Sequence, residues 1–355
     1  MSLLRRQLPL CRRQTEGASL KILVVAPSWI GDTILAQPLL TRLRRKHAGL
    51  HIDVLAPDWS APLLARMDEV RRVISNPFAH GEFNFAARRR LARSLRAEAY
   101  DEAIVLPNSW KSALIPFLAG IPRRTGFVGE ARYFLLNRPR RYDARALPQL
   151  AARYAKLAEE SDAAPLPPLA MPHLQSTAQQ QAAARAALGL PLAASPVIFC
   201  PGAEFGPAKR WPARHFAALA QRLGDTAQPV WLLGSDKDRA VGAEIVQAAH
   251  GAALNLCGRT TLEQAIDLLA GARLVVANDS GLMHVAAALD RPLLALYGSS
   301  SPAYTPPLSR HAKIISLNIA CSPCFQRVCP LGHFKCLEDL TVEQVLPHLE
   351  HHADA

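Results

Sequence analysis

The sequence predicts an α/β protein built from two doubly wound parallel sheets, and three observations support this fold class. Short apolar runs, typical of parallel strands covered on both faces, alternate with amphipathic helical segments. A stretch with four prolines and no periodicity, residues 163–173, interrupts this alternation. The alternation then restarts, which indicates two Rossmann-like domains facing across a cleft.

The first half of the chain contains four predicted strands and several helices. Runs rich in Val, Ile and Leu predict strands at 21–27, 51–57, 70–74 and 101–107. Apolar residues at helical spacing predict helices at 33–47, 61–67, 85–99, 109–119 and 147–160. Pro38 falls near the start of its helix, where a proline is best tolerated. Residues 124–127 begin a less regular section.

The second half repeats the pattern with more elements. Strands are expected at 197–200, 229–234, 253–257, 274–277, 293–297 and 313–317. Helices are expected at 178–188, 213–223, 238–249, 262–270, 282–289 and 341–350. The expected division is a tail at 1–19, a first domain at 20–162, a linker at 163–176, a second domain at 177–337 and a terminal helical segment at 338–355 that can cross back to the first domain.

The stretch from 274 to 298 has the features of a phosphate-binding strand–turn–helix unit. Asp279 or Ser280 can cap the helix, and Gly281 allows a ligand to approach the backbone. A helix that opens just after a parallel strand presents free N–H groups and a positive dipole end. His284 lies one turn inside this helix. The alternative is an ordinary capped βαβ unit without a ligand.

The loop from Cys200 to Pro212 joins a predicted strand to a predicted helix. Its glycines, Gly202 and Gly206, loosen the backbone, while Lys209 and Arg210 bring positive charge. This composition suits a pyrophosphate clamp in which Lys209 neutralises a leaving group. The loop is not a Walker A motif, since no G-K-[ST] follows. A surface loop with a solvated Lys-Arg pair is the alternative.

The turn Ser28–Asp32 follows the first predicted strand and opens a helix. Asp32 in the first turn either stabilises the helix dipole or serves as a general base. Trp29 at the end of a strand favours a ligand that stacks on it.

Charge is unevenly distributed along the chain. The net charge is +12, and residues 1–160 carry 27 Lys and Arg against 14 Asp and Glu. The first half therefore suits an anionic membrane face or a polyanion, or is simply a solubilising surface. Nucleic acid is disfavoured because no recognisable motif accompanies the charge. The first 17 residues hold four arginines without an apolar core, so they do not resemble a signal peptide.

The seven cysteines indicate a reducing cytoplasm, since their number is odd and no secretory signal precedes them. Four of them, Cys321, Cys324, Cys329 and Cys336, have metal-ligand spacing with His333 among them. Reduced thiols that pack a long loop are the alternative. We expect no bound metal.

The motifs above resemble those of the ADP-heptose:lipopolysaccharide heptosyltransferases, the ADP-heptose glycosyltransferase family. Asp279, Ser280, Gly281 and His284 match a D-[ST]-G-x-x-H pattern, and the loop before Pro212 matches P-G-A-E-x-G-x-A-K-R-W-P. Asp32 matches the aspartate of a G-D pair. The cysteine segment is similar to one in the type II branch of the family. The resemblance extends over about residues 21–349.

The resemblance implies a GT-B-like fold with the acceptor on the first domain and the donor on the second. The implied reaction is inverting transfer of L-glycero-D-manno-heptose from ADP-heptose to the first heptose of the lipopolysaccharide inner core, without cofactor or metal. Asp32 would be the catalytic base. The donor-binding candidates are Gly202, Ala203, Lys209, Asp279, Ser280, Gly281 and His284. The acceptor-binding candidates are Trp29, Lys111, Arg124 and Arg132.

The implied location is cytoplasmic and peripheral at the inner membrane, where the enzyme would meet the anionic inner-core acceptor and no nucleic acid. Three alternatives stay open. A heptosyltransferase I or related sugar transferase would share these motifs. A nucleotide-sugar epimerase would need no lipid acceptor, and a non-catalytic nucleotide- or polyanion-binding protein would not depend on Asp32.

Overall fold

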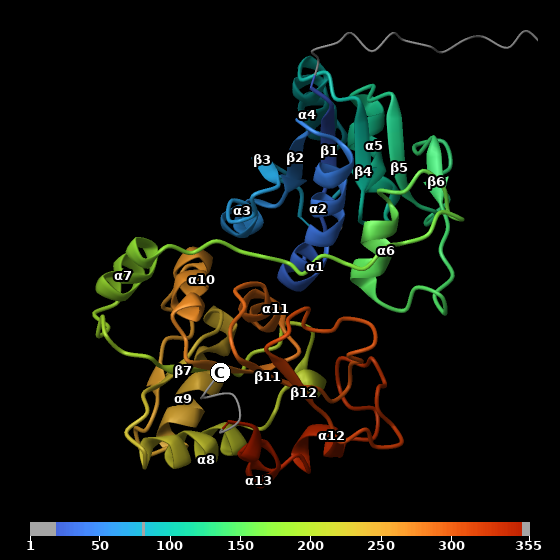
Figure 1. The fold of residues 1–355 in the computed structure, drawn as a ribbon. Helices are drawn as coiled ribbons and strands as arrows, with labels where there is room; N and C mark the ends of the chain where they lie inside the picture. Colours follow the sequence, from blue (N-terminus) through green and yellow to red (C-terminus); the bar gives the residue numbers. More distant parts are fainter. Residues whose placement is uncertain (1–18, 80–81, 350–355) are drawn as a thin grey trace, which may run out of the picture.

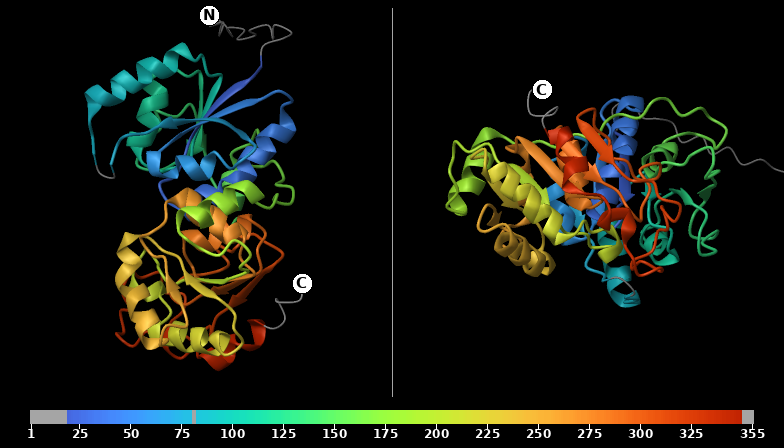
Figure 2. Two further views of the ribbon diagram at one scale, coloured as in Figure 1. Left: turned by 90° about the vertical axis from the view of Figure 1, so that its left-hand side faces the viewer. Right: turned by 90° about the horizontal axis from the view of Figure 1, so that it is seen from below.

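Each half of the chain forms its own six-stranded parallel sheet in the computed structural model, which describes residues 19–79 and 82–349. The strand orders are β3-β2-β1-β4-β5-β6 and β12-β11-β10-β7-β8-β9. In both sheets the order reverses beside a central strand, as in doubly wound folds. Figure 1 and the left view of Figure 2 show the two Rossmann-like domains one above the other, and the two parallel sheets confirm the predicted fold class. No helix of the described residues is long and apolar enough to span a bilayer.

The first sheet is built from β1 (Lys21–Val25), β2 (His51–Ala56), β3 (Val70–Ser75), β4 (Glu102–Val105), β5 (Arg123–Phe127) and β6 (Arg138–Arg140). Its helices are α1 (Ile30–Leu35), α2 (Gln37–Lys46), α3 (Ala61–Leu64), α4 (Phe85–Ala97), α5 (Trp110–Leu118) and α6 (Leu150–Lys156). Alternate residues of β1 face opposite cores: Ile22 and Val24 pack with the α2 side, and Leu23 and Val25 pack with α4 and α5.

The second sheet is built from β7 (Val197–Cys200), β8 (Val230–Leu232), β9 (Leu254–Asn255), β10 (Leu274–Asn278), β11 (Leu293–Leu296) and β12 (Ala312–Ile315). Its helices are α7 (Ala178–Ala187), α8 (Ala213–Gly224), α9 (Arg239–Ala248), α10 (Leu262–Ala270), α11 (Gly281–Ala288), α12 (Lys335–Glu338) and α13 (Val342–Val345). Helices α7 and α10 begin with a capping box, and α8 begins after Pro212.

Three local predictions were wrong. The section after residue 123 forms the parallel strands β5 and β6, although it is rich in arginine, because β5 pairs with β4 and β6 pairs with β5. The predicted helix at 33–47 is divided into α1 and α2 at Ala36, since Pro38 cannot donate the next hydrogen bond. The terminal segment packs on the second domain up to Leu349 rather than crossing back, and residues 350–355 lie outside the described residues.

The chain between α6 and α7 is tied to both domains. The Gln37 side-chain amide on α2 donates to the His173 carbonyl (2.7 Å) and accepts from the His173 N–H (2.9 Å). The Leu174 N–H donates to the Ala288 carbonyl of α11 (2.9 Å), and the Gln175 N–H donates to the Arg66 carbonyl (3.0 Å). We call residues 173–176 the strap. The strap therefore bonds to elements of both domains within three residues.

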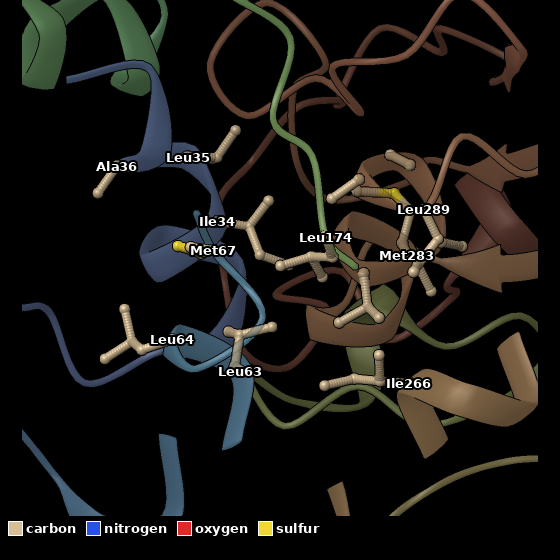
Figure 3. Close-up of a cluster of buried hydrophobic side chains, with 14 of the residues drawn as sticks. Ile34, Leu35, Ala36, Leu63, Leu64, Met67, Leu174, Ile266, Met283 and Leu289 are labelled. Atoms are coloured by element: carbon tan, nitrogen blue, oxygen red, sulfur yellow. The ribbon is translucent and has the colours of Figure 1, made fainter. Parts of the chain in front are cut away.

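One hydrophobic cluster runs through both domains. It includes Ile34 of α1, Ile266 of α10 and Met283 of α11, and Leu174 of the strap lies between them in Figure 3. Beside it, the Arg66 guanidinium forms an ion pair with Asp267 (2.9 Å), and both side chains are largely buried. The domains are thus in direct contact rather than separated by an open cleft at this point.

Helices α1 and α11 approach most closely at two glycines. A Cβ on Gly281 would lie 2.9 Å from the Ile30 Cβ, and a Cβ on Gly31 would lie 2.7 Å from the His284 Cδ2. Such distances are shorter than side chains tolerate, so each helix depends on a glycine to accept the other. Figure 1 shows α1 at the lower end of the first domain, directly above α11.

Gly281→Ala should disturb this domain contact because the added methyl meets a rigid Cβ. We expect the unfolding free energy to fall by about 1–3 kcal/mol, measured by denaturant unfolding. The double variant Ile30→Gly/Gly281→Ala removes the side chain that the new methyl meets, so it should lose less stability than the sum of the two single variants. A single variant as stable as the parent would show that the helices are not in contact.

Candidate active site between the two domains

Asp32 lies in the first turn of α1, just beyond the carboxyl end of β1, where the two domains meet. Burial raises the pKa of the Asp32 carboxyl to about 6; the positive charge of Lys209 opposes this shift and the carboxylate of Asp279 adds to it. Lys209 and Asp279 both belong to the second domain. The structure therefore brings the predicted base of one domain into the electrostatic field of the predicted donor site of the other.

Helix α11 begins directly after β10 without the side-chain cap that the sequence predicted. Ser280 occupies the N-cap position with an extended backbone (φ −146°), and its hydroxyl makes no capping hydrogen bond. Asp279 is turned to Lys209 instead: its carboxylate lies 2.5 Å from the Lys209 Nζ. An uncapped helix start with a lysine beside it is suited to bind a phosphate group.

The loop between β7 and α8 is held at both ends by one side chain, that of Asn278. The Asn278 Nδ2 donates to the Pro201 carbonyl (2.7 Å), and its Oδ1 accepts from the Trp211 N–H (2.9 Å). Trp211 is buried, and its indole N–H donates to the Leu340 carbonyl (2.7 Å). Sequence reasoning missed Asn278, although a polar residue at the end of a buried strand was a usable signal.

Gly202 and Ala203 are packed against the protein at the base of this loop. A Cβ on Gly202 would lie 2.4 Å from the Asp238 Oδ2, and Asp238 accepts hydrogen bonds from the N–H (2.9 Å) and hydroxyl (2.8 Å) of Ser235. Ala203 is buried. These two donor-binding candidates thus lie at the base of the loop, while Lys209 reaches the start of α11.

His284 is buried one turn into α11 and faces α1. Its Nε2 lies 4.0 Å from an Asp279 carboxylate oxygen, and its Nδ1 has no hydrogen-bond partner. Burial lowers the pKa of His284 to about 4, although Asp279 works in the opposite direction. The imidazole is therefore neutral at pH 7. It forms the wall of the site against Gly31.

Two of the four acceptor-binding candidates stabilise the first domain. Arg132 is only 2% exposed, and its guanidinium donates to the carbonyls of Phe127 (2.8 Å) and Pro107 (2.5 Å). Burial lowers its pKa to about 10. Arg124 donates to the carbonyls of Leu135 (2.7 Å) and Ile121 (2.6 Å). Both guanidinium groups are thus bonded within the first domain, and the acceptor contact predicted for Arg124 and Arg132 stays a prediction.

The other two acceptor-binding candidates are placed nearer to the site edge. Trp29 precedes α1 and is 45% exposed, three residues before Asp32. Lys111 lies in the first turn of α5, beyond the carboxyl end of β4. Since the carboxyl ends of parallel strands meet at one edge, Trp29 and Lys111 belong to the same edge of the first sheet as Asp32.

The cysteine segment packs behind the donor loop. Cys321, Cys324, Cys329 and Cys336 are free thiols that line one cavity together with His333. Within residues 19–79 and 82–349, no group of three or more His, Cys, Asp or Glu side chains is arranged to hold a metal. The segment meets the loop where the Ala208 N–H donates to the Arg327 carbonyl (3.1 Å). The Phe205 ring contacts a cation from each segment: its centre lies 5.0 Å from the Lys209 Nζ and 5.1 Å from the Arg327 guanidinium carbon.

The fold and the site together define a class of enzyme. Where the two Rossmann-like domains meet, the first contributes the Asp32 carboxylate, and the second contributes Lys209 beside the uncapped start of α11. This arrangement is expected of a two-domain nucleotide-sugar glycosyltransferase. Residues 88–335 match glycosyltransferase family 9 (heptosyltransferase). The chain belongs to this family.

Three relatives define its place within the family. Lipopolysaccharide heptosyltransferase 2 of Salmonella typhimurium is 47% identical, over 93% of this chain and 97% of the relative. The solved structure of Escherichia coli ADP-heptose lps heptosyltransferase II is 44% identical with a TM-score of 0.84, over 94% of this chain and 98% of that one. Lipopolysaccharide heptosyltransferase 1 of Pseudomonas aeruginosa is only 28% identical, over 92% and 93%. The chain is an enzyme, and it is more similar to the two type 2 proteins than to this type 1 protein.

The structural role of Arg132 can be tested directly. We expect Arg132→Ala to lower the unfolding free energy by about 3 kcal/mol, because several buried carbonyls lose their donor. The control Arg123→Ala removes an arginine of β5 whose side chain is 46% exposed beside Glu102, and should cost less than about 1 kcal/mol. Equal effects of the two substitutions in denaturant unfolding would contradict this assignment.

Proposed function

We propose that the protein transfers L-glycero-D-manno-heptose from ADP-heptose to the first heptose of the lipopolysaccharide inner core, with inversion at the anomeric carbon. The observation that carries this proposal is the position of Asp32 in the field of Lys209 and Asp279 at the start of α11. The names of the type 2 relatives and their identity over most of the chain support the same donor and acceptor.

Asp32 acts as the general base in this proposal. Its carboxylate takes the proton of an acceptor hydroxyl while the hydroxyl oxygen bonds to the anomeric carbon of the donor heptose. The bond from that carbon to the β-phosphate oxygen breaks, and its electron pair leaves with ADP. A pKa of about 6 suits this role, since the group is ionised at pH 7 yet basic enough to accept a proton.

Lys209 and the first N–H groups of α11 stabilise the negative charge of the leaving diphosphate. Lys209 is already at the helix start through its ion pair with Asp279, so the incoming phosphate can replace that carboxylate as its partner. His284, neutral and buried beneath the same turn, supports the position of α11 against α1. This arrangement needs no metal ion.

The acceptor binds on the first domain in this proposal, with Trp29 and Lys111 at the sheet edge beside Asp32. The net charge of residues 1–160, 27 basic against 14 acidic residues, suits the phosphate- and carboxylate-rich inner core. We place the protein in the cytoplasm, peripheral to the inner membrane where this acceptor is anchored.

Replacing the proposed base should abolish transfer without loss of donor binding. For Asp32→Asn we expect ADP release from ADP-heptose, in the presence of a one-heptose lipid acceptor, to slow by about 100-fold or more. ADP affinity, measured by calorimetry, should remain unchanged. The control Asp58→Asn alters an exposed acid of the same domain and should keep full activity.

The pH dependence of the parent tests the same residue. The carboxylate gains a proton as the pH falls through about 6, so kcat/KM should fall tenfold per pH unit below that value and level off above it. The residual activity of Asp32→Asn should lack this transition. Near-normal turnover by Asp32→Asn would refute the assignment of the base.

Lys209→Met should slow transfer because the diphosphate loses its cationic partner. We expect kcat to fall by about 100- to 1,000-fold, as for other preorganised groups that stabilise developing charge, together with weaker ADP binding. Arg210→Met is the matched control: Arg210 is the next residue, points its guanidinium to the Ala203 carbonyl (3.4 Å) and Asp238, and should affect kcat less than tenfold. The reverse order of effects would assign the phosphate contact to Arg210.

A further inference from the structure

We infer that helix α4 and the aromatic residues at its start form a surface that docks on an anionic lipid bilayer. We call this set, Phe83, Phe85, Trp110, Arg89, Arg90 and Arg93, the α4 surface. The inference deepens the proposed function and rests on it in one respect, the membrane anchoring of the acceptor. The exposure, ring contacts and charge of the α4 surface do not depend on that function.

Three large rings meet at the start of α4 and remain open to solvent. Phe83 lies 4.9 Å from Trp110 and 6.2 Å from Phe85, measured between ring centres. Their exposed fractions are 45% for Phe83, 47% for Phe85 and 36% for Trp110. Scattered exposed apolar side chains are ordinary, but three rings in mutual contact form a contiguous apolar patch. Aromatic residues are enriched at the boundary between lipid headgroups and acyl chains.

The helix that continues from these rings carries five arginines and no acidic residue within Phe85–Ala97. Phe85, Arg89 and Arg93 recur at a spacing of four, so they lie on one face of the helix. Arg89, Arg90 and Arg93 are exposed. A basic helix face that adjoins exposed aromatic rings is the combination by which peripheral proteins bind anionic bilayers.

Arg88 differs from the other arginines of α4, because its buried side chain fixes the orientation of the helix on the domain. It is buried, its guanidinium lies 4.0 Å above the Phe78 ring, and it donates to the Glu82 carbonyl (2.9 Å). Ala92 and Leu95 are buried on the same side and belong to the core formed with α5. This side fixes α4 to the domain, so the opposite flank with the exposed arginines faces outward.

Two carboxylates near the rings are engaged with the backbone. Glu82 accepts from the Ala79 N–H (3.1 Å), and Glu130 accepts from the Trp110 N–H (2.9 Å). Both side chains are exposed, and they lie around the rings rather than on α4. The charge that the helix itself presents therefore remains positive, which favours anionic over neutral lipid.

The position of the α4 surface fits a lipid-anchored acceptor. Phe83 follows β3 and Trp110 follows β4, so the rings lie toward the carboxyl edge of the first sheet, the edge that also carries Asp32. Figure 2 shows α4 on the outside of the first domain, away from the second domain. A bilayer docked there would present its surface sugars to the site without covering the domain contact.

The test measures binding of the full-length protein to vesicles. Sedimentation with phosphatidylcholine vesicles, with and without phosphatidylglycerol, should show binding that requires the anionic lipid and weakens with salt. Arg89→Glu/Arg93→Glu and, separately, Phe83→Ser/Phe85→Ser should each reduce the partition coefficient at least tenfold. The matched control Arg222→Glu/Arg310→Glu reverses two exposed arginines of the second domain and should bind as the parent does.

Heptose transfer to a detergent-dispersed acceptor measures the catalytic activity of each variant without a bilayer, so it tests the proposed function independently of membrane docking. Both α4 variants should keep parental turnover there and an unchanged melting temperature. Parental vesicle binding by both α4 variants would overturn the docking surface, as would equal binding to neutral vesicles. A parent that binds anionic vesicles through α4 but releases no ADP with the one-heptose acceptor would refute the proposed function and leave the surface in place.

Discussion

The close approach of α1 and α11 is the constraint on which the site depends. Each helix follows the central strand of its own sheet, and each contributes a glycine, Gly31 or Gly281, where the other presses against it. Because the helices touch, Asp32 is removed from water and enters the field of Lys209 and Asp279. The raised pKa of the base is therefore a product of domain contact. A separated first domain would leave the same aspartate an ordinary solvated acid.

The donor side of the site is rigid for a different reason. The loop that carries Lys209 is closed at its two ends by the Asn278 amide and is covered from outside by the cysteine segment through Arg327. The Phe205 ring contacts two cations, one from each segment. The lysine is thus positioned by groups that never need to contact the substrate. The cysteine segment thus helps to position the loop that carries Lys209.

Much of this architecture could be predicted from the sequence. The Val-, Ile- and Leu-rich runs predicted the central strands of both sheets, and the strand–turn–helix pattern placed Asp32, Lys209 and Ser280 at their carboxyl ends. Strands β5 and β6 escaped prediction because arginine-rich segments have no strand pattern, and they become strands only through pairing with β4 and with each other.

The roles of individual charged side chains were harder to predict. Arg124 and Arg132 look like anion ligands in a basic sequence, yet in the fold they bind carbonyl oxygens. Sequence spacing does not reveal which way an arginine turns. Asn278 was overlooked because its neighbours Asp279 and Ser280 were the more obvious ligand-binding candidates. The Asn278 side chain bridges Pro201 and Trp211, and this contact forms only when β7 and β10 pair in the folded sheet.

The strap determines how the two domains can move. His173 is bound to α2 of the first domain and Leu174 to α11 of the second, so adjacent residues anchor the chain on opposite sides of the contact. Such a short tether limits translation of one domain away from the other. If the domains move to admit substrates, we expect a rotation about an axis close to Leu174, with the greatest displacement at the rim of the site farthest from it.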